Sequence, residues 1–325
     1  MALAKKGIFF TLTSISLLAL IIFIGSISYQ YKYSDKASIT EVRVDTMNSF
    51  VKNIDGDLAR ASYIASFRSL VSIQEFISTK GIFIENLSSA FKELFLNGTL
   101  NGTNVSFMEN NTFGYWSQKI EEESNKIGIN MNVSAKNVSI FQQDPWRVAV
   151  DVNVSIYFYN AMFNVSWSKN KTVSIYVDIV GFEDPFYTIY TNGNVIKNIR
   201  RTPYEGNYTH QLDVTNLEVH VNETYYAAFT GAPSFLMRLQ NDTSASQYGI
   251  ESLVDKSKVD AYHSCDDGTA AKSSVDYLYW SCSPISAYEI SGMSIKFPNF
   301  RIDNSSSQGK THLEKYNVTH LAIVP

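Results

Sequence analysis

The feature that most constrains this 325-residue chain is a long uncharged stretch close to its N-terminus. No charged side chain occurs in residues 8–30, and residues 8–27 form a mostly apolar run of 20 residues. As a helix, such a run would be about 30 Å long, which matches the hydrocarbon core of a bilayer. We therefore expect a transmembrane helix over residues 8–30 rather than a helix buried in a globular core.

The charges before this stretch predict its direction. Lys5 and Lys6 precede it directly, and positive charge favours the cytoplasmic side of a membrane. The expected protein is therefore single-pass in the cell membrane, with its N-terminus inside and its C-terminal head outside the cell. A cleaved secretory signal is the alternative, with residues 25–28 as a weak cleavage site, but the apolar run is long for such a signal.

The helix is expected to continue beyond the apolar stretch. Apolar residues recur every three or four positions at 47, 51, 54, 58, 61 and 64, which makes one stripe along a helix. No proline occurs before Pro145. One helix from residue 8 to about residue 78 would place residues 31–80 outside the membrane, packed under a globular head. The alternative is two helices, with a break at Gly25, at Gly56 or near Asp35.

The rest of the chain predicts an α+β fold with an antiparallel, β-rich head. Residues 81–204 contain two amphipathic patterns, at 84–96 and 115–127, with a polar loop at 97–112 between them. Four strands are expected between residues 129 and 179, because apolar residues alternate there, most clearly in 148–158, and residues 168–171 look like a turn. Residues 205–325 predict a second, irregular β-rich domain, with strands at 211–221 and 290–297 and a helix at 233–239.

Sequons for N-linked glycosylation are unusually frequent. The chain has 26 asparagines and 15 Asn-x-Ser/Thr sequences, all after residue 85, where chance would give roughly five. In the alternating strand patterns, Asn132, Asn153 and Asn164 take the register that faces solvent. The excess predicts N-linked glycans on an extracellular surface, and the alternative is a polar surface without sugar. The expected acceptors are Asn86, Asn97, Asn101, Asn104, Asn110, Asn132, Asn137, Asn153, Asn164, Asn170, Asn207, Asn222, Asn241, Asn304 and Asn317.

Cys265 and Cys282 are the two cysteines of the chain. Outside the cell, an even pair favours a disulfide, and closing a loop of this size adds about 3 kcal/mol of stability. Metal binding is the alternative, because His263 lies two residues before Cys265, but the chain has no Cys-x-x-Cys pair. We therefore predict a disulfide and no metal.

The sequence contains no recognisable catalytic motif. H-E-x-x-H, G-x-S-x-G, the P-loop and G-x-G-x-x-G are all absent, so we predict no enzyme activity and no cofactor. A surface hydrolase remains a third hypothesis, because catalytic triads assemble across the sequence. A net charge of −4 without a basic stripe argues against a nucleic-acid partner. Residues 121–123 are interpreted as a solvated helix face, and Asp144 and Asp184, each followed by proline, as turns.

The N-terminal junction resembles a class III signal, the type found in type IV prepilins. Lys5, Lys6 and Gly7 precede Ile8, and the resemblance implies that a peptidase cuts after Gly7, which makes residues 1–7 a leader. Leu12 stands where bacterial pilins carry glutamate, a position at which archaeal pilin-like proteins vary more. The stretches KGIFFTL at 6–12, GFEDPFY at 181–187, APSFLMRL at 232–239, YGIESLV at 248–254 and SVDYLY at 274–279, with residues 50–61, are similar to archaeal surface proteins with type IV pilin-like N-termini.

That resemblance implies class and location, and it assigns no functional residue. Our leading hypothesis is a glycosylated extracellular, pilin-like structural subunit that packs against copies of itself through the N-terminal helix, with a lollipop shape. The alternative is a single-pass, membrane-anchored cell-surface protein for adhesion, envelope structure or ligand binding that forms no filaments.

Overall fold

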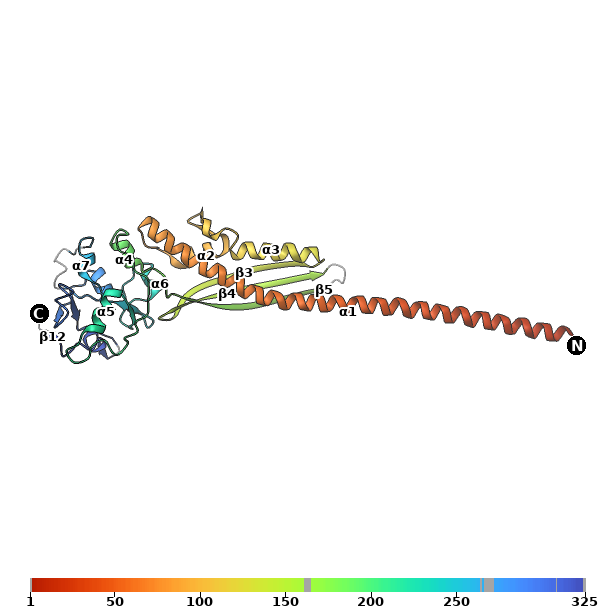
Figure 1. The fold of residues 1–325 in the computed structure, drawn as a ribbon. Coiled ribbons are helices and arrows are strands. Elements are labelled where there is room, and N and C mark those ends of the chain that lie inside the picture. Colours follow the sequence, from red (N-terminus) through yellow and green to blue (C-terminus); the bar gives the residue numbers. More distant parts are fainter. Residues whose placement is uncertain (1, 161–164, 264, 266–271, 308, 324–325) are drawn as a thin grey trace. The chain divides into compact units, whose positions relative to one another are not determined.

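A computed structural model describes residues 2–160, 165–263, 265, 272–307 and 309–323. The chain divides into two compact units, residues 1–58 and 59–325. Helix α1 (Ala2–Lys80) contains the described part of the first unit and ends in the second (Figure 1). The expected continuous helix is confirmed, because neither Gly25 nor Gly56 interrupts it. It ends where Gly81 takes a positive φ of 67°, with its N–H donating to the carbonyl of Ile77.

The predicted transmembrane helix is wrong. In the part of the chain that the structure describes, no helix is both long and apolar enough to cross a membrane. Within the apolar run, the side chains that are described are those of residues 14–27. The α+β class and the antiparallel pairing of the predicted strands are confirmed.

The second unit contains a long three-stranded antiparallel sheet in the order β3 (Asn130–Asp144), β4 (Arg147–Asn160) and β5 (Val165–Asp178). Alternate residues of β4 from Val148 to Phe158 are buried, which confirms the period of two. Three strands form instead of the predicted four, because β5 continues through residues 168–171 without a turn. Lys169 and Lys171 pair with Ile156 and Val154, so the polar residues of this stretch belong to the strand.

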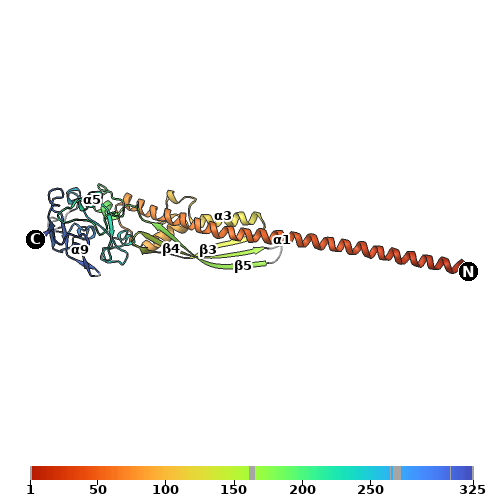
Figure 2. The same cartoon turned by 60° about the horizontal axis from the view of Figure 1, so that its bottom comes forward.

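Two helices flank the sheet, close to their predicted positions: α2 (Leu87–Asn97) and α3 (Phe113–Lys126). Each begins at a capping side chain, since Asn86 accepts from the Ser89 N–H and Thr112 from the Tyr115 N–H. Figures 1 and 2 show α3 running along the sheet, where Glu121 Oε1 accepts from the Val133 N–H at 2.8 Å. Glu121 therefore joins α3 to β3 and is not simply solvated. The loop between the helices folds as β1 (Thr99–Leu100), β2 (Thr103–Asn104) and the 3-10 helix η1 (Ser106–Met108).

The C-terminal half of the second unit consists of short elements around an aromatic core that includes Tyr187, Tyr208, Tyr279 and Trp280. Its helices are α4 (Pro185–Tyr190), α5 (Thr215–Glu223), α6 (Phe235–Arg238), α7 (Lys256–Val259), α8 (Asp276–Trp280) and α9 (His312–Lys315). Its strands are β6 (Tyr226–Ala228), β7 (Ile250–Ser252), β8 (Ala287–Ile290), β9 (Arg301–Asp303), β10 (Ser306–Ser307), β11 (Lys310–Thr311) and β12 (Ala322–Ile323). They pair as β6–β7, β12–β8–β9 and β10–β11, all antiparallel.

Three predictions for this half have clear outcomes. The helix expected at 233–239 is confirmed as α6. The strand expected at 211–221 is wrong, since α5 forms there with Leu217, His220 and Val221 buried at helical spacing. The strand expected at 290–297 is also wrong, because β8 ends at Ile290 and Gly292 turns the chain with a φ of 90°.

Candidate functional site

Four predicted glycan acceptors share one face of the long sheet. Asn137 pairs directly with Asn153, and Asn132 and Asn170 lie on the same side of the sheet. All four side chains are exposed, whereas the opposite face carries the buried alternate residues of β4. We call the side that these asparagines share the acceptor face. The pairing of the three strands therefore brings four of the predicted glycan acceptors onto one surface.

A β-bulge makes this arrangement possible. Asn132 and Asn137 are five positions apart, so in a regular strand they would point to opposite faces. The register of β3 shifts between Ala135 and Asn137, and the extra residue, Lys136, restores Asn137 to the outer side. Strand periodicity alone could not show this, because a bulge leaves little signal in a single sequence.

Two sequons on the acceptor face pair reciprocally. Asn153 lies opposite Thr172, which completes the Asn170 sequon, and Asn170 lies opposite Ser155, which completes the Asn153 sequon. The Thr172 hydroxyl donates to the Asn153 side-chain oxygen at 2.7 Å. This bond engages the side-chain oxygen of Asn153 and not its amide nitrogen, to which a sugar would be attached.

Most other predicted acceptors are accessible as well. Of the 14 sequon asparagines in the described residues, 13 are exposed and Asn317 is half-buried, while Asn164 lies outside the described residues. The Asn317 side chain donates to the Gly206 carbonyl at 2.9 Å. Exposure permits modification at these positions, and Asn317 is the least accessible of them.

The predicted processing junction lies at the start of α1. The structure gives Lys5, Lys6, Gly7 and Ile8 a helical backbone, but their side chains are outside those that it describes. Within residues 14–27 of the first unit, large apolar side chains are exposed all round the helix, from Ile27 at 44% to Ile15 at 69%. Ser14, Leu17, Leu18 and Ile21 line a shallow groove of about 260 Å³.

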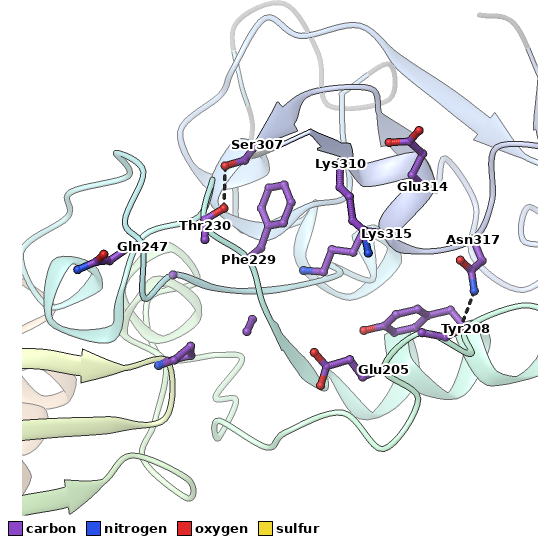
Figure 3. A pocket seen from close by; sticks show the side chains of 14 residues that line it. Glu205, Tyr208, Phe229, Thr230, Gln247, Ser307, Lys310, Glu314, Lys315 and Asn317 are labelled. Carbon is purple, nitrogen blue, oxygen red and sulfur yellow. Dashed lines mark hydrogen bonds between the residues drawn. The ribbon is translucent and has the colours of Figure 1, made fainter.

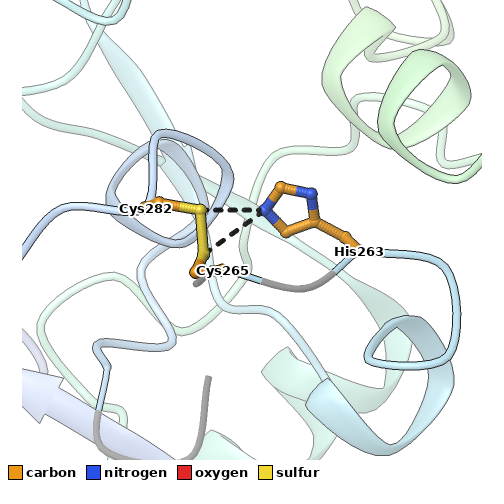
Figure 4. Close-up of side chains that lie close together, drawn as sticks. All are labelled: His263, Cys265 and Cys282. Carbon is orange, nitrogen blue, oxygen red and sulfur yellow. Dashed lines mark hydrogen bonds between the residues drawn. A yellow bond between two sulfur atoms is a disulfide. The ribbon is translucent and has the colours of Figure 1, made fainter. Parts of the chain in front are cut away.

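The predicted disulfide is confirmed, because Cys265 and Cys282 are bonded in the structure. The imidazole of His263 lies against both sulfurs, as Figure 4 shows, with Nε2 at 3.8 Å from Cys265 Sγ and 3.6 Å from Cys282 Sγ. Burial lowers the pKa of His263 below its usual value.

A cavity of about 530 Å³ opens in the C-terminal half of the second unit (Figure 3). Lys310 and Lys315 lie close to the ring of Phe229, and Glu205 and Glu314 also line the cavity. The Lys315 ammonium is held by Glu251 Oε1 at 2.7 Å and lies 4.7 Å from the Phe229 ring centroid. The lining therefore balances positive and negative charges over one aromatic ring, which suits a small polar ligand better than a strongly charged one.

The same half contains a fully buried ion cluster that the sequence did not predict. Arg238 Nη1 contacts Asp184 Oδ2 at 2.7 Å and Asp276 Oδ2 at 3.0 Å, and all three side chains have no exposed surface. The Tyr226 hydroxyl donates to Asp184, and the Ser252 hydroxyl donates to Asp276. Burial raises the pKa of Asp276, against the attraction of Arg238. Asp184 is thus a core residue that also caps α4, rather than the turn residue that we predicted.

A second buried cluster surrounds His312. Its Nδ1 lies 2.8 Å from Asp303 and its Nε2 lies 3.2 Å from Glu251. Burial alone would lower the pKa of His312, but Glu251 and Asp303 raise it to about 9. Burial would raise the pKa of Glu251, but Lys315 and His312 lower it to about 2. Because both ring nitrogens are occupied by carboxylates, this histidine is charged and held in place rather than free to transfer protons.

The two clusters meet along β7, where Glu251 and Ser252 are neighbours. Asp184, Arg238, Glu251 and Asp276 each come from one of the four C-terminal stretches that carry the resemblance described above. The signal that could have found them was therefore present: each of the four is a charged residue among mostly apolar and aromatic ones, in short stretches that lie far apart in the sequence. No protein-family model, curated protein or solved structure matches this chain.

Proposed function

We propose that this chain is a glycosylated, extracellular structural subunit that assembles with copies of itself through its apolar N-terminal helix, in the manner of a pilin. The acceptor face is the observation that carries the proposal. Four sequons on three strands converge there on one exposed surface, although the regular register of β3 would have turned one of them inward.

Glycans need an accessible amide nitrogen, and a protein core needs apolar side chains. The sheet separates the two requirements. Its buried side carries Val150, Val152 and Val154, while its outer side carries mainly serine, threonine and asparagine, with the exposed rings of Tyr157 and Tyr176. Sugars on the outer side would therefore leave the packing untouched. This arrangement favours an extracellular surface protein over an intracellular one, where N-linked glycans are not used.

Self-assembly is supported by the first unit. A helix that is apolar all round must be covered, because exposed apolar area costs about 25 cal/mol per Å². The groove is lined by Ser14, Leu17, Leu18 and Ile21, at positions i, i+3, i+4 and i+7 of the helix. In coiled coils, four residues with this spacing form the hole that receives one side chain of a neighbouring helix. A second copy supplies such a side chain from the same apolar stretch, so we propose copies of this chain as the occupant.

The test uses the cells that naturally make the chain. Their surface fraction is sheared off and examined by electron microscopy, and its peptides are examined by mass spectrometry. We expect filaments in which this chain is the main protein, with a mature N-terminus at Ile8 and hexose mass on peptides that contain Asn132, Asn137, Asn153 or Asn170. A matched pair of variants controls the sugar assignment, because Ser139→Thr keeps the Asn137 sequon whereas Ser139→Ala removes it.

Other results would contradict the proposal. A chain recovered as single molecules with residues 1–7 attached would support an individual cell-surface protein instead of a filament subunit. A chain without any sugar mass on the acceptor face would show that this face does not carry glycans, and the proposal would lose its main support.

A further inference from the structure

The contact between His263 and the disulfide is independent of the glycans and of self-assembly. His263 Nε2 and the two sulfurs all lie within 4.8 Å of one another. One imidazole and two cysteine sulfurs are ligands that zinc binds in proteins. In the disulfide the sulfurs are bonded to each other, so in that state they are not available as thiolates.

The distances from the imidazole nitrogen to the two sulfurs are close to those of a metal site. In a tetrahedral site with Zn–S of about 2.3 Å and Zn–N of about 2.0 Å, the nitrogen and each sulfur are about 3.5 Å apart. The observed separations from His263 Nε2 are 3.6 and 3.8 Å. The two sulfurs would need to move to about 3.8 Å apart. Because the Cα atoms of Cys265 and Cys282 are 5.7 Å apart, side-chain rotation can provide that movement.

The imidazole is also held in a fixed orientation. Its ring packs against Tyr190, Tyr279 and Trp280, with centroids 5.1–5.4 Å apart. This packing fixes the plane of the ring, and Nε2 points at the two sulfurs.

We propose that His263, Cys265 and Cys282 form a redox-gated Zn²⁺ site, closed as a disulfide and opened by reduction. A thiol reductant supplies the two electrons: two reductant thiols become one disulfide, and Cys265 and Cys282 each gain a hydrogen. Zn²⁺ then displaces both thiol protons and binds the two thiolates and His263 Nε2. Water completes the fourth position, as in zinc sites with three protein ligands.

The experiment compares the oxidised full chain with the chain reduced by a phosphine, which is converted to its oxide. Each form is desalted without oxygen, incubated with Zn²⁺ and analysed for bound metal, and Co²⁺ is used in parallel for its thiolate charge-transfer absorption. We expect about one Zn²⁺ per reduced chain and none per oxidised chain. Cys282→Ser should abolish binding. His263→Ala should weaken it by roughly tenfold or more, and change the Co²⁺ spectrum, whereas the exposed-histidine control His210→Ala should bind as the wild type does.

Circular dichroism keeps the test decisive. A reduced chain that retains its spectrum but binds no Zn²⁺ overturns the proposal, and so does a His263→Ala variant that binds as tightly as the wild type. If reduction disrupts the fold, adding Zn²⁺ should restore the circular dichroism spectrum of the reduced wild type. It should not restore the spectrum of the reduced His263→Ala variant. Failure of that restoration also overturns the proposal.

Discussion

Arg238 has no exposed surface, so its charge depends entirely on Asp184 and Asp276. Removing one member of a buried ion cluster leaves the others charged and unpaired in a medium that solvates them poorly. We expect Arg238→Met to lower the free energy of unfolding by about 3–5 kcal/mol, measured by urea denaturation. Arg201→Met is the matched control, because Arg201 pairs with Glu205 at the surface. Arg201→Met should lower the free energy of unfolding by less than about 1 kcal/mol. Equal losses in the two variants would contradict the assignment of Arg238 to a buried ion cluster.

His312 predicts a dependence of stability on pH. Its folded pKa of about 9 lies above the usual value of 6.5. The folded state therefore holds this proton more tightly, so its stabilising contribution is complete below about pH 6.5 and is lost as the pH rises through about 9. Asp303, Glu251, Lys315 and the Tyr277 hydroxyl surround the ring.

The prediction is tested by denaturation of the wild type and His312→Gln at pH 6 and at pH 9.5. The stability difference between them should shrink by an amount on the order of 3 kcal/mol at the higher pH. A difference that stays constant between the two pH values would show that His312 is not charged in the fold.

At this scale, the sequence predicted the residues whose chemistry is local. Cys265 and Cys282 could be paired from their number and type alone. Asp184 could not be placed, because an aspartate before a proline looks the same whether it caps a solvated turn or binds a buried arginine 54 positions away. Burial of a charge is decided by partners that are distant in sequence.

Among the elements, those with long periodic patterns were predictable. The helix period predicted α1, α2 and α3, and the alternation of Val148 to Phe158 predicted β4. The prediction failed where the pattern was short. At residues 211–221 the chain forms α5, whose Leu217, His220 and Val221 are buried at helical spacing. The bulge at Lys136 and the continuity of β5 depend on pairing with β4, which a single strand does not encode.

Helix α1 carries a prediction about self-assembly. Leu17→Gln together with Leu18→Gln places amides in the groove that we assign to a neighbouring helix, and burying an amide without a partner is costly. Sedimentation should show a shift from assemblies toward single chains. Leu17→Met with Leu18→Met keeps the apolar volume and should assemble as the wild type does. Unchanged assembly of the glutamine variant would show that this groove is not the contact.

For the whole molecule, the sequence predicted the α+β class but not the division at residue 58 or the arrangement of the C-terminal half. That half consists of helices and strands of two to nine residues. Its fold therefore depends on side-chain packing and on the buried ion clusters, which have no periodic signal in the sequence.

The disulfide is expected to contribute to the stability of this half. Cys265 and Cys282 are 17 positions apart. A disulfide that closes a loop of this size stabilises the fold by about 3 kcal/mol, because it lowers the conformational entropy of the unfolded chain. Reduction in the presence of a chelator should lower the free energy of unfolding by that amount. Cys265→Ser with Cys282→Ser should match the reduced wild type and should not respond to reductant. A double variant as stable as the oxidised chain would contradict this assignment.

The direct pairing of Asn137 with Asn153 limits how the two can be modified together. Their Cβ atoms are separated by about 5 Å, as in any cross-strand pair, so the first sugar attached to one would crowd the enzyme that approaches the other. Occupancy at the two positions should therefore be mutually exclusive in most molecules. Cleavage after lysine alone releases both on a single peptide, residues 137–169, which also contains the predicted acceptor Asn164. In an Asn164→Gln variant, the mass distribution of this peptide should show one-sugar forms in excess of two-sugar forms. The population of chains would then be a mixture of alternative glycoforms, set by the spacing of two strands.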